Sequence, residues 1–139
     1  MNPVELQAAI YARLNVVGIT ALLTASYGVT AIFNEWVPQV TDAGDPAFFP
    51  FVTMSFPAST EYDDKTATGQ NSLVQIDVWS RVNSTQVKVI AKAVYDALHR
   101  QALAVTGHVT TQIEDMTFER DPDGITRRGR LSFRVLAIA

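Results

Sequence analysis

The fold is indicated most clearly by residues 113–138, which read IEDMTFERDPDGITRRGRLSFRVLAI. Within this stretch, residues 121–124 read Asp-Pro-Asp-Gly, with proline and glycine where a type I turn prefers them. From Ile125 to Ile138 an apolar and a polar face alternate, formed by Leu131, Phe133, Val135 and Ala137 and by Arg128, Arg130, Ser132 and Arg134. The stretch therefore predicts a β-hairpin. Its register should be fixed, because a slip of one residue would bury the arginines.

Three further strands are expected before this hairpin. Asn71–Val82 alternates, with Val74, Ile76 and Val78 on one face and Gln75, Asp77 and Trp79 on the other. Val29–Asn34 is β-branched and aromatic, and Phe51–Phe56 is a short apolar run that Pro50 opens. The segment Pro57–Gln70 joins the strand Phe51–Phe56 to the strand Asn71–Val82. It is polar and too long for a tight turn, so it is either a mobile loop or an extended hairpin arm.

Two amphipathic helices are expected. Asn2, Pro3 and Glu5 have the spacing of a capping box with proline at the first helical position, and Gly18 would end this first helix. A short extra turn of helix can follow at Ile19–Leu23. Asn83 and Gln86 would cap the second helix, whose apolar stripe comprises Val87, Ile90, Ala91, Val94 and Leu98.

The order of these elements is helix, three strands, helix, two strands. It predicts one α+β domain over residues 1–139, in which a mostly antiparallel or mixed sheet of about five strands has both helices on one face. The length of 139 residues agrees with a single domain.

Composition excludes several classes of protein. The chain has no cysteine, which excludes disulfides and thiolate metal sites. With 47% hydrophobic residues, the chain is not disordered. A net charge of −3 argues against a protein that binds nucleic acid in bulk, because such proteins usually have a strongly basic face. The stretch from Leu14 to Asn34 lacks charge, but polar residues and glycines interrupt it, so we expect neither a membrane span nor a signal peptide.

The sequence holds no recognisable catalytic or metal-binding constellation, and no cofactor is expected. His99 and His108 lie at a helix end and in the following turn, without metal-ligand spacing. Residues 121–124 lack the further ligands of a calcium loop, so a hairpin turn is the favoured interpretation. A small hydrolase or nuclease would require Glu114, Asp115 and His108 to converge in a cleft.

Charge is distributed unevenly along the chain. Residues 1–70 carry two bases against seven acids, a net charge of −5, whereas residues 71–139 carry nine bases against seven acids, a net charge of +2. Complementary faces of this kind allow head-to-tail association, which closes into a ring when the rotation permits. The candidate interface residues are the basic Arg128, Arg130 and Arg134 and the acidic Asp42, Asp45, Glu61, Asp63 and Asp64.

Several segments, in their order and spacing, resemble the tail completion family of long-tailed bacteriophages and gene transfer agents, also called tail terminator or head–tail joining proteins. These segments are LQAAIYARL at Leu6–Leu14, FPFVTM at Phe49–Met54, QIDVWSR at Gln75–Arg81, DALHR at Asp96–Arg100 and RDPDGITRRGRLSFRVLAI at Arg120–Ile138. The segment from Asn34 to Phe49 is longer than the family pattern.

The resemblance implies a structural virion protein rather than an enzyme. Such a protein forms a ring, usually of six copies, which caps the head-proximal end of the tail tube, ends tube growth and offers a surface to the head connector. Its implied partners are itself, the tail tube protein and the connector. DNA passes through the ring, and assembly takes place in the host cytoplasm. A neck or head-completion protein and a tail tube subunit remain alternatives within the structural class.

Overall fold

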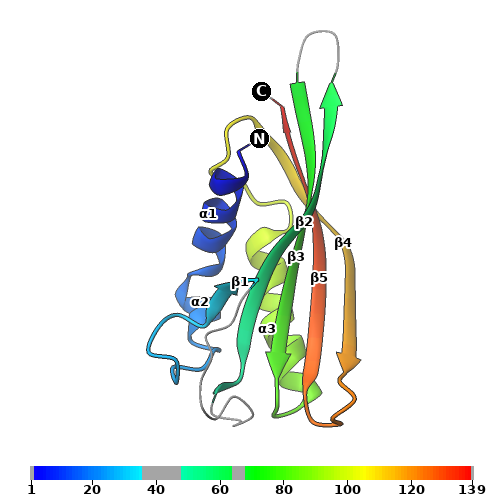
Figure 1. Ribbon diagram of the computed structural model, residues 1–139. Coiled ribbons are helices and arrows are strands. Elements are labelled where there is room, and N and C mark those ends of the chain that lie inside the picture. The colour runs from blue at the N-terminus through cyan, green and yellow to red at the C-terminus, as the bar shows by residue number, and fades with distance from the viewer. Residues whose placement is uncertain (1, 36–47, 64–67, 139) are drawn as a thin grey trace.

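The computed structural model describes residues 2–35, 48–63 and 68–138. Its elements in chain order are α1 (Pro3–Leu14), α2 (Val17–Thr20), β1 (Ile32–Asn34), β2 (Phe51–Asp63), β3 (Thr68–Ser80), α3 (Ser84–Leu98), β4 (His108–Arg120) and β5 (Arg127–Ile138). Figure 1 shows α1 and α3 on the same side of one sheet, and β2 and β3 extending beyond the helices. The predicted α+β class and the shared helix face are confirmed.

The five strands are arranged in the order β1-β2-β3-β5-β4. The short β1 pairs in parallel with β2, and every other neighbouring pair is antiparallel, so the sheet is mixed. The predicted C-terminal hairpin is present as β4 and β5. Its turn closes as expected, because the Gly124 N–H donates to the Asp121 carbonyl at 2.9 Å.

The expected register of β5 is confirmed. Leu131, Phe133 and Val135 are fully buried against the helices. On the neighbouring β3, Ile76 pairs with Leu131, so the apolar positions of the two strands share one face. Burying each of these large side chains is worth about 1.5–3 kcal/mol, which holds the register against slippage.

Helix α3 begins as the sequence predicts. The Asn83 side chain accepts from the Gln86 N–H at 2.8 Å. The side chain of Gln86 does not return to Asn83, because its carbonyl oxygen accepts from the Ser80 hydroxyl at the end of β3. All five residues of the predicted apolar stripe are buried in the main core. The stripe packs α3 on β3 and β5.

Helix α1 differs from the prediction at both ends. Asn2 caps it by accepting from the Val4 N–H at 2.9 Å, but the Glu5 carboxylate accepts from the backbone and hydroxyl of Thr106 instead of completing a capping box. The helix ends at Leu14, so the prediction that Gly18 ends it was wrong. Gly18 lies inside the separate turn α2, which is the predicted extra turn of helix begun two residues earlier.

All five strands have bounds that differ from those predicted: β3 is shifted toward the N-terminus, to Thr68–Ser80, and β5 starts at Arg127 rather than Ile125. β1 starts at Ile32 rather than Val29, and β4 starts at His108 rather than Ile113. β2 continues past Phe56 to Asp63, because it remains paired with β3 along its length. Residues 57–70 therefore contain the two sides of a hairpin arm, and not an irregular loop. Residues 64–67 lie outside the described part.

Candidate assembly surfaces

The outer face of the sheet, opposite the helices, carries the arginines that the sequence singles out. Each forms an ion pair with an acid of a neighbouring strand in the same chain. Arg128 pairs with Glu119, Arg130 with Asp77 (Nε to Oδ1, 3.1 Å), and Arg134 with Glu114 (Nε to Oε1, 2.7 Å). We call these three pairs the arginine ladder.

Strand register builds the ladder. Asp77 is the cross-strand partner of Arg130, and Glu119 is that of Arg128. Glu114 lies in the irregularity between Ile113 and Asp115, where β4 shifts its register against β5. Three bases and three acids neutralise one another, so the ladder has no net charge. Its contact with a neighbouring copy, predicted from the sequence, stays a prediction.

Arg128 is the most enclosed member of the ladder. Its hydrogen bond to Glu119 raises the pKa of the guanidinium above its ordinary value, against the opposing effect of burial. The guanidinium carbon also lies 5.3 Å from the centroid of the Trp79 ring. Its Nε atom is buried without a hydrogen-bond partner among the described residues. Arg128 therefore stays charged and is held in place by Glu119 and Trp79.

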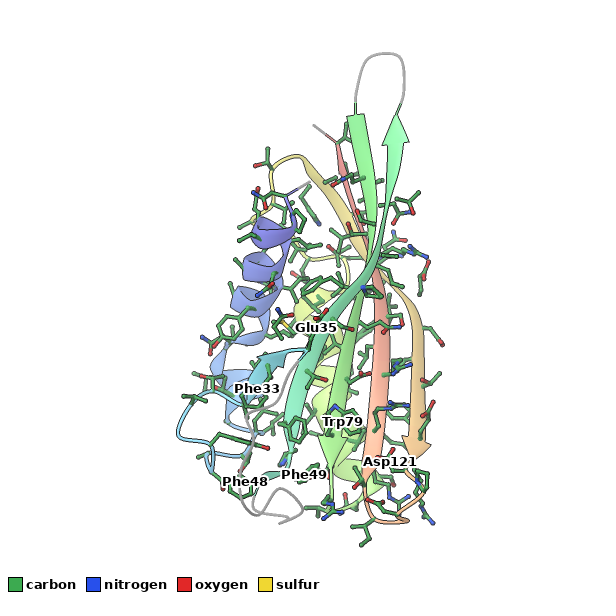
Figure 2. All side chains as sticks on the ribbon, in the orientation of Figure 1. Phe33, Glu35, Phe48, Phe49, Trp79 and Asp121 are labelled. Carbon is green, nitrogen blue, oxygen red and sulfur yellow. The ribbon has the colours of Figure 1, made fainter. Side chains whose placement is uncertain are left out.

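Beside the ladder lies an aromatic cluster that was not predicted from the sequence. It comprises Tyr27, Phe33, Phe48, Phe49, Phe51 and Trp79. Phe51 stacks on Trp79 with 6.1 Å between ring centroids, and the Trp79 Nε1–H donates to Thr53 Oγ1 at 3.1 Å. A cavity of about 460 Å³ opens beside these rings, between Glu35 and Asp121 (Figure 2).

A signal for this cluster was present in the sequence. Phe48, Phe49 and Phe51 are nearly contiguous, but only the sheet brings them to Trp79, because Phe51 and Trp79 are cross-strand partners. The predicted interface residues Asp42 and Asp45 belong to 36–47, which lie outside the described residues.

The hairpin arm is the second candidate surface. β1 pairs with β2 only as far as Met54, so the arm lies beyond the paired part of that edge. The register of β2 against β3 shifts between Ser55 and Ala58, where the arm begins. Ser59 and Ser72 face each other across it, with 3.0 Å between their hydroxyl oxygens. Of the predicted acidic residues, Glu61 and Asp63 are in the β2 side of the arm, and Asp64 lies outside the described residues.

The turn between β4 and β5 is held together by hydrogen bonds to the carboxylate of Asp123. Asp123 accepts from the backbone N–H groups of Ile125 and Thr126, both at 2.8 Å, and from the Thr126 hydroxyl at 2.7 Å. Arg81 adds an ion pair at 3.2 Å. These hydrogen bonds, above all that from Thr126, hold the pKa of Asp123 far below its ordinary value. The Asp123 carboxylate therefore has a structural role in this turn.

Three of the residues considered for enzymatic chemistry have hydrogen-bond partners within the chain, namely His99, His108 and Glu114. His108 Nε2 lies 2.7 Å from Thr111 Oγ1, and partial burial lowers the pKa of its imidazole. His99 Nδ1 accepts from the Ile113 N–H at 3.1 Å, while Glu114 belongs to the ladder. Over residues 2–35, 48–63 and 68–138 there is no group of three or more residues suited to a metal ion. Nor is any helix in these ranges long and apolar enough to cross a membrane.

The family model described as "Tail completion protein gp17" matches residues 17–137, which is most of the chain. The chain belongs to the tail completion family. The resemblance seen in the sequence is therefore confirmed. As a member of this family, the protein is a structural component of the virion tail and not an enzyme.

Individual relatives agree with the family. "Tail completion protein gp17" of Bacillus phage SPP1 is 27% identical over 103 residues, covering 72% of this chain and 77% of the relative. A chain in the structure "Virion of native gene transfer agent (GTA) particle" is 26% identical, with a TM-score of 0.70 and coverage of 96% and 95% of the two chains. The structure of SPP1 gp17 shares the fold, with a TM-score of 0.54, 21% identity and coverage of 94% and 86%.

Proposed function

We propose that this tail completion protein forms a ring of six copies that caps the head-proximal end of the tail tube. The ring ends tube growth and gives the head connector a surface to join, and DNA later passes through it without sequence-specific binding. The observation that carries the proposal is the near-complete match to a chain of a gene transfer agent virion, which covers 96% of this chain and 95% of the other.

The surface of the protein supports a function that depends on contacts with other protein subunits. Several large apolar side chains are well exposed, including Val4, Val17, Val29 and Val82. The hairpin arm extends away from the helices (Figure 1). Apolar surface of this kind is buried when subunits assemble, and an extended arm lets one subunit reach another. The partners proposed are further copies of this chain, the tail tube protein and the head connector.

The test is electron microscopy of negatively stained tail tubes mixed with the purified protein, together with light scattering on the eluted complex. We expect one ring at one end of each tube and no further growth of capped tubes when tube subunits are added. Long cylinders formed by this protein alone would instead identify a tail tube subunit. Binding to heads but not to tubes would identify a neck or head-completion protein.

A further inference from the structure

Two arginines face each other at the end of the sheet opposite the hairpin arm. Arg120 ends β4, Arg127 begins β5, and the two are direct cross-strand partners. Like charges placed directly opposite in a sheet are destabilising. Neither residue has an ion pair within the described ranges of the chain. The fold therefore keeps a repulsive pair that no acid of these ranges relieves.

A third base joins this pair from the helix layer. Lys88 of α3 lies with its Nζ 5.8 Å from the centroid of the Phe118 ring, and it lines the same shallow depression of about 210 Å³ as Arg120 and Arg127. The one acid along this depression, Glu119, is bonded to Arg128. We call Lys88, Arg120 and Arg127 the basic end.

The basic end differs from the other arginines of the sheet. All three bases of the arginine ladder have a carboxylate within the chain, and so does Arg81, through Asp123. Natural sequences generally avoid like charges directly opposite each other in a sheet. A like-charge pair that nothing compensates therefore indicates a functional position. An anionic group from outside the chain would turn the repulsion at the basic end into attraction.

The surroundings favour a protein carboxylate over a nucleic-acid phosphate. Phe118 is 43% exposed beside the bases, and Ile125 and Val82 at the same end are 54% and 61% exposed. Arginine together with exposed aromatic and aliphatic side chains is typical of protein interfaces. The net charge of −3 opposes binding to a polyanion such as DNA.

The chain itself carries an acidic segment that fits. Glu61 and Asp63 lie on the arm, whose last described pair joins Asp63 to Thr68 at one end of β3. At the other end of β3, Ser80 pairs with Arg127. The 13 residues of β3 span about 40 Å at roughly 3.3 Å per residue, so the arm cannot reach its own basic end.

We propose that the basic end receives the acidic arm of a neighbouring copy. The contact is heterologous, since each copy offers an arm at one end and accepts one at the other, and contacts of this type can close into a ring. The inference rests on the proposed function, in which copies of this chain assemble. It transfers the basic side of the predicted interface from the arginine ladder to Lys88, Arg120 and Arg127.

The first test is charge reversal of the full-length protein with Arg120→Glu and Arg127→Glu. Sedimentation velocity and counting of capped tube ends should show assembly weakened at least about tenfold, because like charges then meet across the contact. The midpoint of thermal unfolding should stay near that of the parent, since one like-charge pair replaces another. The matched control is Lys92→Glu with Arg100→Glu, which changes net charge equally at exposed positions that do not line this depression and should assemble normally.

The second test is rescue. Glu61→Arg with Asp63→Arg should also weaken assembly, and combining these substitutions with Arg120→Glu and Arg127→Glu should restore it. Because the chain has no cysteine, the contact can also be trapped with Thr60→Cys on the arm and Ser84→Cys beside the basic end. Oxidation of the assembled protein should give a ladder of disulfide-linked copies.

The outcomes separate this inference from the proposed function. Normal assembly of the reversed variant, or a combined variant that is not rescued and gives no disulfide ladder, overturns the inference while leaving the ring intact. Loss of duplex DNA binding in the reversed variant, with assembly unchanged, would identify DNA as the partner and also overturn it. Copies that cross-link as expected but never bind tube ends support the inference and overturn the proposed function instead.

Discussion

At the scale of single residues, Asp123 shows how one side chain fixes the hairpin on which the sheet depends. Its carboxylate accepts hydrogen bonds from three groups of Ile125 and Thr126 and is paired with Arg81. The folded protein therefore holds this carboxyl ionised, with a pKa well below its ordinary value of 3.8. Between the two pKa values the unfolded chain binds the proton more tightly, so acid favours unfolding there.

We expect Asp123→Asn to lower the midpoint of thermal unfolding at neutral pH, because asparagine keeps an oxygen acceptor but loses the charge. The difference from the parent should shrink as the pH falls below 3.8, where the parent loses the benefit of the ionised carboxylate. Thermal unfolding followed by circular dichroism over a pH series measures this. A difference that stays constant with pH would show that the charge of Asp123 contributes nothing.

Gly129 is fixed by close approach rather than by an unusual backbone angle. A Cβ at this position would lie 2.8 Å from Cγ1 of Val87 and 3.2 Å from Cε1 of Phe118. Val87 belongs to α3 and is buried, so it has little room to move. The missing side chain therefore allows the first turn of α3 to lie against β5.

Gly129→Ala should lower the free energy of unfolding by about 1–3 kcal/mol, the usual cost of overpacking a filled core. Urea unfolding of the two proteins measures the difference. Adding Val87→Ala should recover part of it, since the smaller side chain makes room for the new methyl group. Gly18→Ala is the matched control: its Cβ would meet nothing within 4 Å, so no loss is expected. An equal loss in both variants would refute the packing explanation.

At the scale of elements, the hairpin arm is paired with β5 at its base through Gly69 and Gln70, but no described residue of the arm belongs to the main hydrophobic core. Among the described residues, the main hydrophobic core includes no residue of β2 after Phe56 and none of β3 before Val74. The arm instead carries small polar residues such as Ser59, whose hydroxyl bonds to that of Ser72 on β3. Its length is therefore explained better by contact with a partner than by stability of the monomer.

Replacing residues 61–70 with Asn-Gly should leave the fold intact, because Thr60 and Asn71 are cross-strand partners and a two-residue turn can join them. We expect the midpoint of thermal unfolding to change by no more than about 4 °C, equivalent to roughly 1 kcal/mol in a domain of this size. Capping of tail tubes, counted by electron microscopy, should be lost. A shortened protein that unfolds early would instead assign the arm to the stability of the monomer.

At the scale of the whole molecule, one main core joins elements from both halves of the chain. Leu6 and Ile10 of α1 belong to the same buried cluster as Val94 of α3 and Phe133 of β5. Arg13 adds a direct link, because its Nε donates to the Ala97 carbonyl of α3 at 2.9 Å. That residues 1–139 form one folding unit remains a prediction. The shared core supports it.

We therefore expect a single cooperative unfolding transition that is the same by tryptophan fluorescence and by far-ultraviolet circular dichroism. Phe133→Ala should shift both signals together and cost about 3–5 kcal/mol, because it leaves a cavity at the centre of the core. The exposed Val89→Ala on α3 is the control and should have little effect. Two separate transitions in either protein would contradict the single unit.

Much of the fold could be predicted from local patterns. Alternation identified β3 and β5, and the Asp-Pro-Asp-Gly turn identified the hairpin, because side-chain period and turn geometry are local properties. The far end of β2 and the start of β4 were misplaced, since pairing with a neighbouring strand decided them. The local pattern also could not show that Glu5 bonds to the distant Thr106 instead of completing a capping box.

The sequence by itself determined the α+β class, the buried faces and the family, because each depends on patterns read along the chain. Only the tertiary structure decided which charges remain unpaired. Arg128, Arg130 and Arg134 find acids on neighbouring strands, whereas Arg120 and Arg127 face each other, and no count of charge along the chain distinguishes these cases. The physical reason is that an ion pair depends on a few ångströms of cross-strand register, which is set by the packing of the whole sheet.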